Sequence, residues 1–146
     1  MIYLDYTANT PADPDVLDAY LAAERRYIAN PNSTHIAGQE ARAEMERVTQ
    51  SIAQHLGVQP AEIIYTSGAS EANNLALKGI AHASRHIGKH IISTQLEHSS
   101  VGASLSALQQ QGYEIDLVDI KQDGTVDLAH LRELLRPDTL LVAVTA

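Results

Sequence analysis

The sequence predicts an α/β fold with a mostly parallel sheet flanked by helices, and three observations lead to it. Short aliphatic runs occur at 62–66, 90–94, 113–118 and 140–144. Stretches with helical character separate them, near 70–84, 99–110 and 128–135. Runs such as 140–144 are also apolar on both faces, as in strands that helices cover above and below. This alternation indicates βαβ units around a parallel sheet.

Two helices are predicted ahead of the first aliphatic run. Asp13 is the expected cap of the first, with Pro14 at its first helical position and an end near Tyr27. A turn-forming break at 29–33 precedes a longer helix that Gly57 is expected to end. We therefore expect one incomplete α/β domain over 1–146, with a helical arm at 1–57 and a βαβ part at 58–146. The last predicted strand closes the chain with nothing left to cover one side, which suggests a fragment.

Charge and composition exclude several classes of function. The formal net charge is −8, whereas nucleic acids and anionic membranes require a basic face, so neither is an expected partner. No apolar run approaches the length of a membrane span, and the start lacks a secretion signal, so we expect a cytoplasmic protein. The absence of cysteine excludes disulfides, thiolate metal sites and a cysteine nucleophile within these residues.

The turn at 67–71 is the most informative stretch. An aliphatic run leads into small residues, and a helix begins at once, so the turn is expected at the carboxyl end of a strand, where α/β folds bind ligands. The amides of Gly68, Ala69 and Ser70 would point outward as free donors, a typical site for a phosphate. A second interpretation is that Ser67 only caps the helix, with Ser70 or Glu71 completing the arrangement. The P-loop and dinucleotide patterns are absent, so nucleoside triphosphates and NAD are not expected.

Four ordered segments carry a resemblance to a known family. They are 3–11 (YLDYTANTP), 30–35 (NPNSTH), 65–79 (YTSGASEANNLALKG) and 89–94 (KHIIST), the last followed by Glu97 and His98. Together they resemble the cysteine desulfurases of the NifS/IscS type, which belong to the class V aminotransferase family of pyridoxal-phosphate enzymes. The resemblance spans the whole chain. It implies the N-terminal portion of the large domain of fold type I.

The resemblance also implies roles for individual residues on the cofactor side. The amides of Ala69 and Ser70, with the Ser70 hydroxyl, would hold the cofactor phosphate in a cup that includes Gly68. His98 would stack on the pyridine ring and take part in proton transfer, which makes it the candidate catalytic residue. The alternative for His98 is that it caps the helix beginning near Ser99.

The substrate side is less well defined by the resemblance. Asn9 and Thr10 are placed near the substrate pocket, with the alternative that they only shape the opening turn. The family opening is commonly Asp-Asn-Ala-Ala-Thr-Thr-Pro, whereas here Tyr6 and Thr7 replace the Asn and the first Ala, and Asn9 replaces a Thr. His35 is expected to be structural, and Glu71 and Asn74 are expected to fix the turn.

The implied activity is the conversion of L-cysteine to L-alanine with transfer of the sulfur as an enzyme-bound persulfide. The implied partners are a second copy in a homodimer and, in principle, a sulfur-acceptor protein. The Schiff-base lysine and the catalytic cysteine of the family are expected beyond residue 146, and none of Lys78, Lys89 and Lys121 is expected to replace that lysine. Cofactor binding by these residues alone is therefore expected to be weak or absent.

Two alternatives to a desulfurase stay open. One is a related class V aminotransferase or a selenocysteine lyase, which share the same phosphate cup. The other is a non-catalytic half-domain that acts by oligomerisation. No metal site is expected: His82, His86 and His90 are spaced by four, but Gly88 breaks the helix between them and no carboxylate completes a set.

Overall fold

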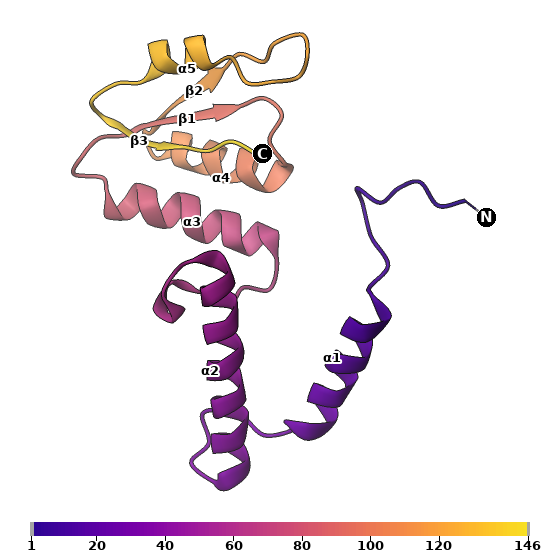
Figure 1. Ribbon diagram of the computed structural model, residues 1–146. Coiled ribbons are helices and arrows are strands. Elements are labelled where there is room, and N and C mark those ends of the chain that lie inside the picture. The colour runs from indigo at the N-terminus through magenta and orange to yellow at the C-terminus, as the bar shows by residue number, and fades with distance from the viewer. Residues whose placement is uncertain (1, 146) are drawn as a thin grey trace. The chain divides into compact units, whose positions relative to one another are not determined.

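The computed structural model describes residues 2–145 as two compact units, one extending to Ile64 and the other starting at Tyr65. The first unit contains helix α1 (Pro14–Arg26), helix α2 (Ile36–Leu56) and the short 3-10 helix η1 (Pro60–Glu62), as Figure 1 shows. Very few of its side chains are buried. Helix α1 has no buried residue, and α2 buries Gly38, Ala41 and Ala53.

The boundaries of both helices follow from the predicted caps. The Asp13 carboxylate accepts a hydrogen bond of 2.8 Å from the Asp15 amide, and Pro14 occupies the first helical position. Helix α2 is capped by His35, whose Nδ1 accepts from the Gly38 amide at 3.2 Å. It ends at Gly57, which has the left-handed φ of 69° that glycine adopts at little cost. The predicted helix ends, and the structural role predicted for His35, are confirmed.

The prediction of a strand at 62–66 is wrong. Pro60 opens η1, and the Glu62 carboxylate folds back to accept a hydrogen bond of 2.7 Å from the Gln59 amide. Residues 63–66 continue without regular structure, and no strand in the described part of the chain pairs with them. An aliphatic run forms a strand only when a neighbour satisfies its backbone, which is why the pattern alone misled here.

The second unit is an α/β layer structure whose three strands are all parallel. Strand β1 (His90–Thr94) lies between β2 (Glu114–Val118) and β3 (Thr139–Val142), and His90 is opposite both Glu114 and Thr139. Helices α3 (Ala69–Ala83), α4 (Ser99–Gln110) and α5 (Leu128–Leu134) accompany the strands. The predicted fold class is confirmed, and β1 and α4 have the predicted bounds.

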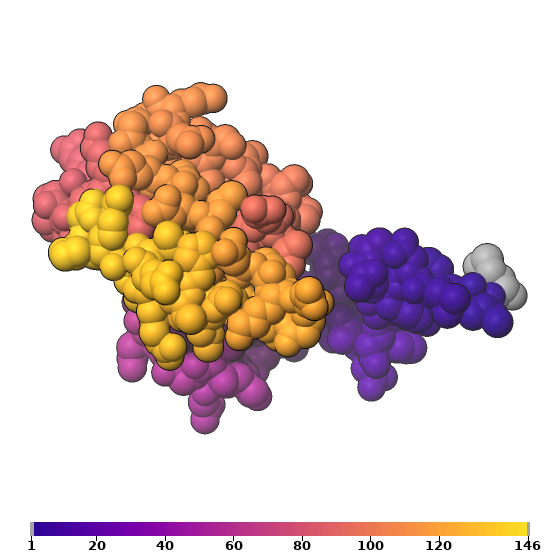
Figure 2. All heavy atoms as spheres, turned by 90° about the horizontal axis from the view of Figure 1, so that it is seen from above, coloured from indigo at the N-terminus to yellow at the C-terminus, as the bar shows by residue number. Residues whose placement is uncertain are grey.

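The two faces of this sheet carry different helices. The chain moves from β1 through α4 to β2, and then back past β1 through α5 to β3. Because such crossovers are right-handed, the reversal of direction puts α4 and α5 on opposite faces. Figure 1 shows α3 and α4 together below the sheet and α5 above it. Seen from above in Figure 2, the orange and yellow segments after α4 cover this side of the second unit.

The core of the second unit is centred on β1. All five residues of β1 are buried, including the polar His90 and Ser93. Strand β3 lies at one edge and is only half buried, with Val142 40 % exposed. Aliphatic residues of α3, α4 and β1 form one cluster with Tyr113: Leu77, Ala81, Ile91, Val101, Leu105 and Leu108. This cluster fixes α3 and α4 on the same face of the sheet.

Candidate functional site

The start of helix α3 has backbone donors to spare. Gly68 is its N-cap residue, and no side chain caps the helix. The Ala72 amide donates to the Gly68 carbonyl at 3.1 Å. Ala69 and Ser70 are the first two residues of the helix, and a helix leaves the amides of its first turn without partners inside the helix. A β-carbon built on Gly68 meets no atom within 4 Å, so the approach to these amides is open.

Ser67 does not cap the helix, which corrects one of the two interpretations of this turn. Its amide and hydroxyl instead donate to the Glu71 carboxylate at 2.6 and 2.7 Å. These two hydrogen bonds hold the pKa of Glu71 below its ordinary value. The Asn74 side-chain amide donates to the Ser70 carbonyl at 2.8 Å. Glu71 and Asn74 therefore fix the turn, as expected, while the helix amides stay available.

His98 caps helix α4 through one of its two ring nitrogens. Its Nδ1 accepts from the Ser100 amide at 3.2 Å and lies 2.9 Å from the Ser100 hydroxyl. Its Nε2 makes no hydrogen bond to any described residue, and the side chain is exposed. The capping interpretation is thus correct for Nδ1, and it leaves Nε2 free for chemistry.

The structure brings the predicted phosphate cup and His98 to the same edge of the unit. The Asn73 side-chain amide, near the start of α3, donates to the Ser100 hydroxyl in the first turn of α4 at 2.9 Å. At the other end of the two helices the Tyr113 hydroxyl, just past α4, donates to the Ala81 carbonyl at 2.8 Å. Helices α3 and α4 therefore run side by side in the same direction, with both N-termini at one edge.

A groove of about 300 Å³ lies beside His98, between α3 and the end of β3. Asn73, Glu97 and Val101 also line it. Glu97 accepts hydrogen bonds from the Thr94 hydroxyl at 2.8 Å and from the Thr145 amide and hydroxyl at 3.0 and 2.6 Å. Burial acts to raise the pKa of Glu97, but these hydrogen bonds outweigh it and keep the pKa below its ordinary value. The carboxylate thereby ties the turn before α4 to the chain beyond β3.

Asn9 and Thr10 belong to the first unit and are exposed. The Tyr3 hydroxyl donates to the Asn9 carbonyl at 3.0 Å, and the Thr10 hydroxyl donates to the Tyr6 carbonyl at 3.1 Å. These contacts are local to the opening turn. The role of Asn9 and Thr10 near a substrate pocket stays a prediction.

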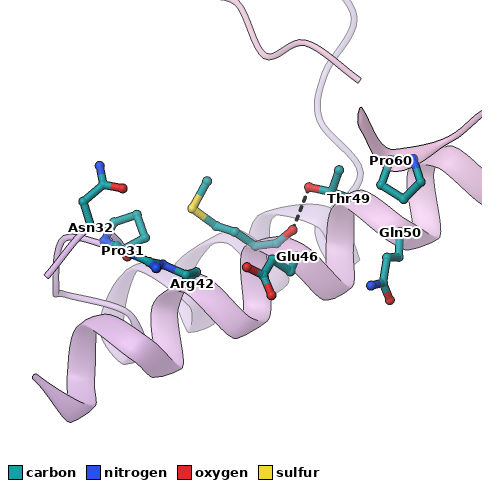
Figure 3. A pocket seen from close by; sticks show the side chains of 8 residues that line it. Pro31, Asn32, Arg42, Glu46, Thr49, Gln50 and Pro60 are labelled. Atoms are coloured by element: carbon teal, nitrogen blue, oxygen red, sulfur yellow. Dashed lines mark hydrogen bonds between the residues drawn. The ribbon is translucent and has the colours of Figure 1, made fainter. Parts of the chain in front are cut away.

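A larger groove of about 390 Å³ lies in the first unit and contains none of the predicted site residues. Figure 3 shows it along α2, between the loop that carries Pro31 and the η1 residue Pro60. The Arg42 Nε donates a hydrogen bond to the Pro31 carbonyl at 2.8 Å. Thr49 donates to the Met45 carbonyl at 2.7 Å. The lining of this groove comes from α2, η1 and the loop at Pro31, and it includes no residue of the predicted phosphate cup.

Sequence reasoning missed the contribution of Asn73 and Ser100. The two residues are 27 positions apart, and only the packing of α3 on α4 brings them together. The described residues contain no group of three or more His, Cys, Asp or Glu suited to a metal ion. Nor do they include a helix that is both long and apolar enough to cross a membrane.

The second unit is an α/β structure in which the uncapped start of α3 and the exposed His98 at the start of α4 lie at the same edge. The aminotransferase class V family model matches residues 2–146, and the chain belongs to that family. The mitochondrial cysteine desulfurase of Arabidopsis thaliana is 45 % identical over 146 residues, which are 99 % of this chain and 32 % of that protein. The resemblance to cysteine desulfurases is thereby confirmed.

Solved structures agree with this assignment. A NifS-like protein superposes with a TM-score of 0.88 at 36 % identity, covering 94 % of this chain and 38 % of that one. A structure described as SspA in complex with cysteine superposes with a TM-score of 0.87 at 33 % identity. The match covers 97 % of this chain and 41 % of that one. The chain thus spans about a third of the length of the curated relatives it matches.

Proposed function

We propose that this chain is the segment of a pyridoxal-phosphate-dependent cysteine desulfurase that holds the cofactor phosphate and presents His98 to the cofactor ring. The observation that carries the proposal is the pairing of two helix starts, the uncapped start of α3 and the start of α4 with His98, through the hydrogen bond between Asn73 and Ser100. Relatives named cysteine desulfurase support the reaction class.

The donor set at α3 fits a phosphate. The amides of Ala69 and Ser70 and the Ser70 hydroxyl would each donate to a phosphate oxygen, and the positive end of the α3 dipole would favour the negative charge. The dipole contributes up to about 2 kcal/mol, and each charge-assisted hydrogen bond about 1.5–3 kcal/mol. Association costs cancel much of this gain. The expected dissociation constant is about 0.1–1 mM.

When bound, pyridoxal phosphate supplies the conjugated system that accepts electrons from the amino-acid substrate. The residues of this chain have simpler tasks. Gly68 leaves space for the phosphate, and Ser70 orients it. The His98 ring would lie on the pyridine and hold or move a proton at Nε2. The chain has no cysteine, so the thiol that receives the substrate sulfur is proposed to come from elsewhere in the protein.

The remaining assignments are part of the same proposal. L-cysteine is the proposed substrate, supported by the relatives' names and by the similarity to SspA, whose solved structure is a complex with cysteine. Asn9 and Thr10 are proposed to lie near it. A homodimer and a sulfur-acceptor protein are the proposed partners. The cytoplasm is the proposed compartment, although the Arabidopsis thaliana relative is named as mitochondrial.

The decisive experiment titrates the chain with pyridoxine 5′-phosphate, which lacks the aldehyde and so cannot react with lysines. Amide NMR shifts report where it binds. We expect the Ala69 and Ser70 amides to move most, with a dissociation constant of about 0.1–1 mM. Gly68→Asp gives α3 the side-chain cap that it lacks and puts a carboxylate in the phosphate position. It should abolish binding while stabilising the helix by about a few tenths of a kcal/mol.

The matched control is Gly79→Asp, which adds the same charge to the same helix far from its start, where a β-carbon also meets no atom within 4 Å. Binding should survive there. Equal affinity in Gly68→Asp and Gly79→Asp would contradict the proposal, as would shifts centred outside the start of α3.

The rival function, a non-catalytic half-domain that acts by pairing, also has an observation in its favour. Helix α1 exposes Val16, Leu17 and Tyr20 and buries nothing. An apolar stripe of this kind gains stability when a partner covers it. This second hypothesis is compatible with the same uncapped start of α3, but it gives His98 no catalytic role.

A further inference from the structure

The hydrogen bonds around His98 determine where its proton lies. The Ser100 backbone amide can only donate, and it points at Nδ1 from 3.2 Å. A nitrogen that accepts a hydrogen bond carries a lone pair and not a hydrogen. This backbone donor favours the neutral tautomer that carries its hydrogen on Nε2.

A second donor is directed at the same nitrogen. The Asn73 amide donates to the Ser100 oxygen at 2.9 Å, which uses one of its lone pairs. The Ser100 hydroxyl hydrogen is then free to point at Nδ1, 2.9 Å away. Asn73, Ser100 and His98 thus form a directed chain in which each group donates to the next.

This chain of hydrogen bonds is held in place by buried atoms. Ser100 is 8 % exposed, and its carbonyl accepts from the hydroxyl of the fully buried Ser104 at 2.8 Å. Hydrogen bonds shielded from water in this way are stronger than exposed ones. Glu97, the residue before His98, is itself tied to Thr94 and Thr145. The backbone at His98 and the Nδ1 side of its ring are therefore both held in place.

We propose that Asn73 and Ser100 are positioning residues that hold neutral His98 in the tautomer with hydrogen on Nε2, the nitrogen that bonds no described residue. The helix that would hold the cofactor phosphate thereby also decides which nitrogen of His98 can give a proton and which cannot. The catalytic value of this arrangement rests on the proposed function, whereas the tautomer is a property of the ring itself.

The reversal of one hydrogen bond tests the proposal sharply. Asn73→Asp is isosteric, but it replaces the donor to Ser100 with an acceptor. The Ser100 hydroxyl then turns to the new carboxylate and offers its lone pair to Nδ1, which favours a hydrogen there. Asn74→Asp is the matched control, because it makes the same change one residue on, where the side chain bonds Ser70 and not Ser100.

The measurement is a long-range proton–nitrogen NMR correlation on the 15N-labelled chain without cofactor, at a pH where the ring is neutral. His98→Gln identifies the signal. In the unmodified chain we expect Nδ1 to resonate as a non-protonated nitrogen and Nε2 as a protonated one. Asn73→Asp should move the Nδ1 signal toward the protonated position, and Asn74→Asp should leave it in place.

Two results would overturn the proposal: a hydrogen on Nδ1 in the unmodified chain, or equal shifts in the two Asp variants. If Asn73→Asp does not fold, Ser100→Ala replaces it. That variant keeps the backbone donor and loses the hydroxyl, so a smaller move in the same direction is expected, with Ser100→Thr restoring the original signal. Because no cofactor is present, failure of phosphate binding leaves this result unaffected.

Discussion

His90 is a fully buried histidine at the start of the central strand β1, and its side chain joins all three strands. Its Nδ1 lies 2.8 Å from the Thr139 hydroxyl on β3, and its Nε2 lies 3.0 Å from the Asp116 carboxylate on β2. The Arg136 amide donates to the same Thr139 oxygen, so the Thr139 hydroxyl hydrogen is free to point at Nδ1. The ring therefore has both nitrogens bonded in the core and acts as a structural connection.

Replacing His90 by Ala should lower the free energy of unfolding by about 2–4 kcal/mol. The change leaves a cavity and removes the partners of Thr139 and Asp116. Chemical denaturation monitored by circular dichroism measures the effect. His86→Ala is the control, because His86 is exposed and should change stability by no more than about 0.5 kcal/mol. Similar losses in both variants would argue against a structural role for His90.

At the scale of single elements, the turn between β1 and α4 depends on one carboxylate. Glu97 receives three hydrogen bonds from Thr94 and Thr145, and its pKa is lowered. A carboxyl with a lowered pKa stabilises the folded state above its ordinary pKa of 4.5. That stabilisation disappears as the pH falls below this value and the group becomes protonated.

Glu97→Gln should therefore reduce the free energy of unfolding by about 1–2 kcal/mol near pH 7. The difference between the variant and the original chain should shrink as the pH falls below about 4.5. Denaturation curves at a series of pH values measure it. A difference that stays constant from pH 7 to pH 3 would mean that the charge of Glu97 makes no contribution.

The success of sequence-based prediction also differs between elements for physical reasons. The bounds of β1 and α4 are predictable because an aliphatic run and a cap at His98 mark them locally. The prediction for 62–66 fails because a strand depends on a neighbour that the local pattern does not specify. The start of α3 is predictable from its small residues, and its role as a phosphate site stays a prediction. The hydrogen bond between Asn73 and Ser100 depends on packing between helices and has no local signal.

At the scale of the whole chain, the two units differ in how much they bury. All five residues of β1 are buried, whereas α1 buries none. Local opening is easiest where few apolar contacts must be broken. The two units are therefore expected to differ in stability as well as in structure.

Hydrogen–deuterium exchange should be slow in His90–Thr94 and fast in Pro14–Arg26. Mass spectrometry of peptides from the exchanged chain gives both rates in one experiment. If α1 becomes protected as the protein concentration rises, a second copy covers its exposed Val16, Leu17 and Tyr20, and the pairing hypothesis gains support. Slow exchange in α1 at high dilution would contradict the expectation.

The central place of β1 also has a consequence for the order in which the chain folds. His90 bonds a residue 26 positions ahead on β2 and another 49 positions ahead on β3. Closing the loop from His90 to Thr139 costs roughly 0.6 kcal/mol more conformational entropy than closing the loop to Asp116. The longer loop can close only after the ribosome has made β3. During synthesis β1 and β2 can pair first around α4. A nascent chain that pairs in this order would have one side of β1 uncovered until Thr139 is made, and its central histidine would lack one of its two partners until then.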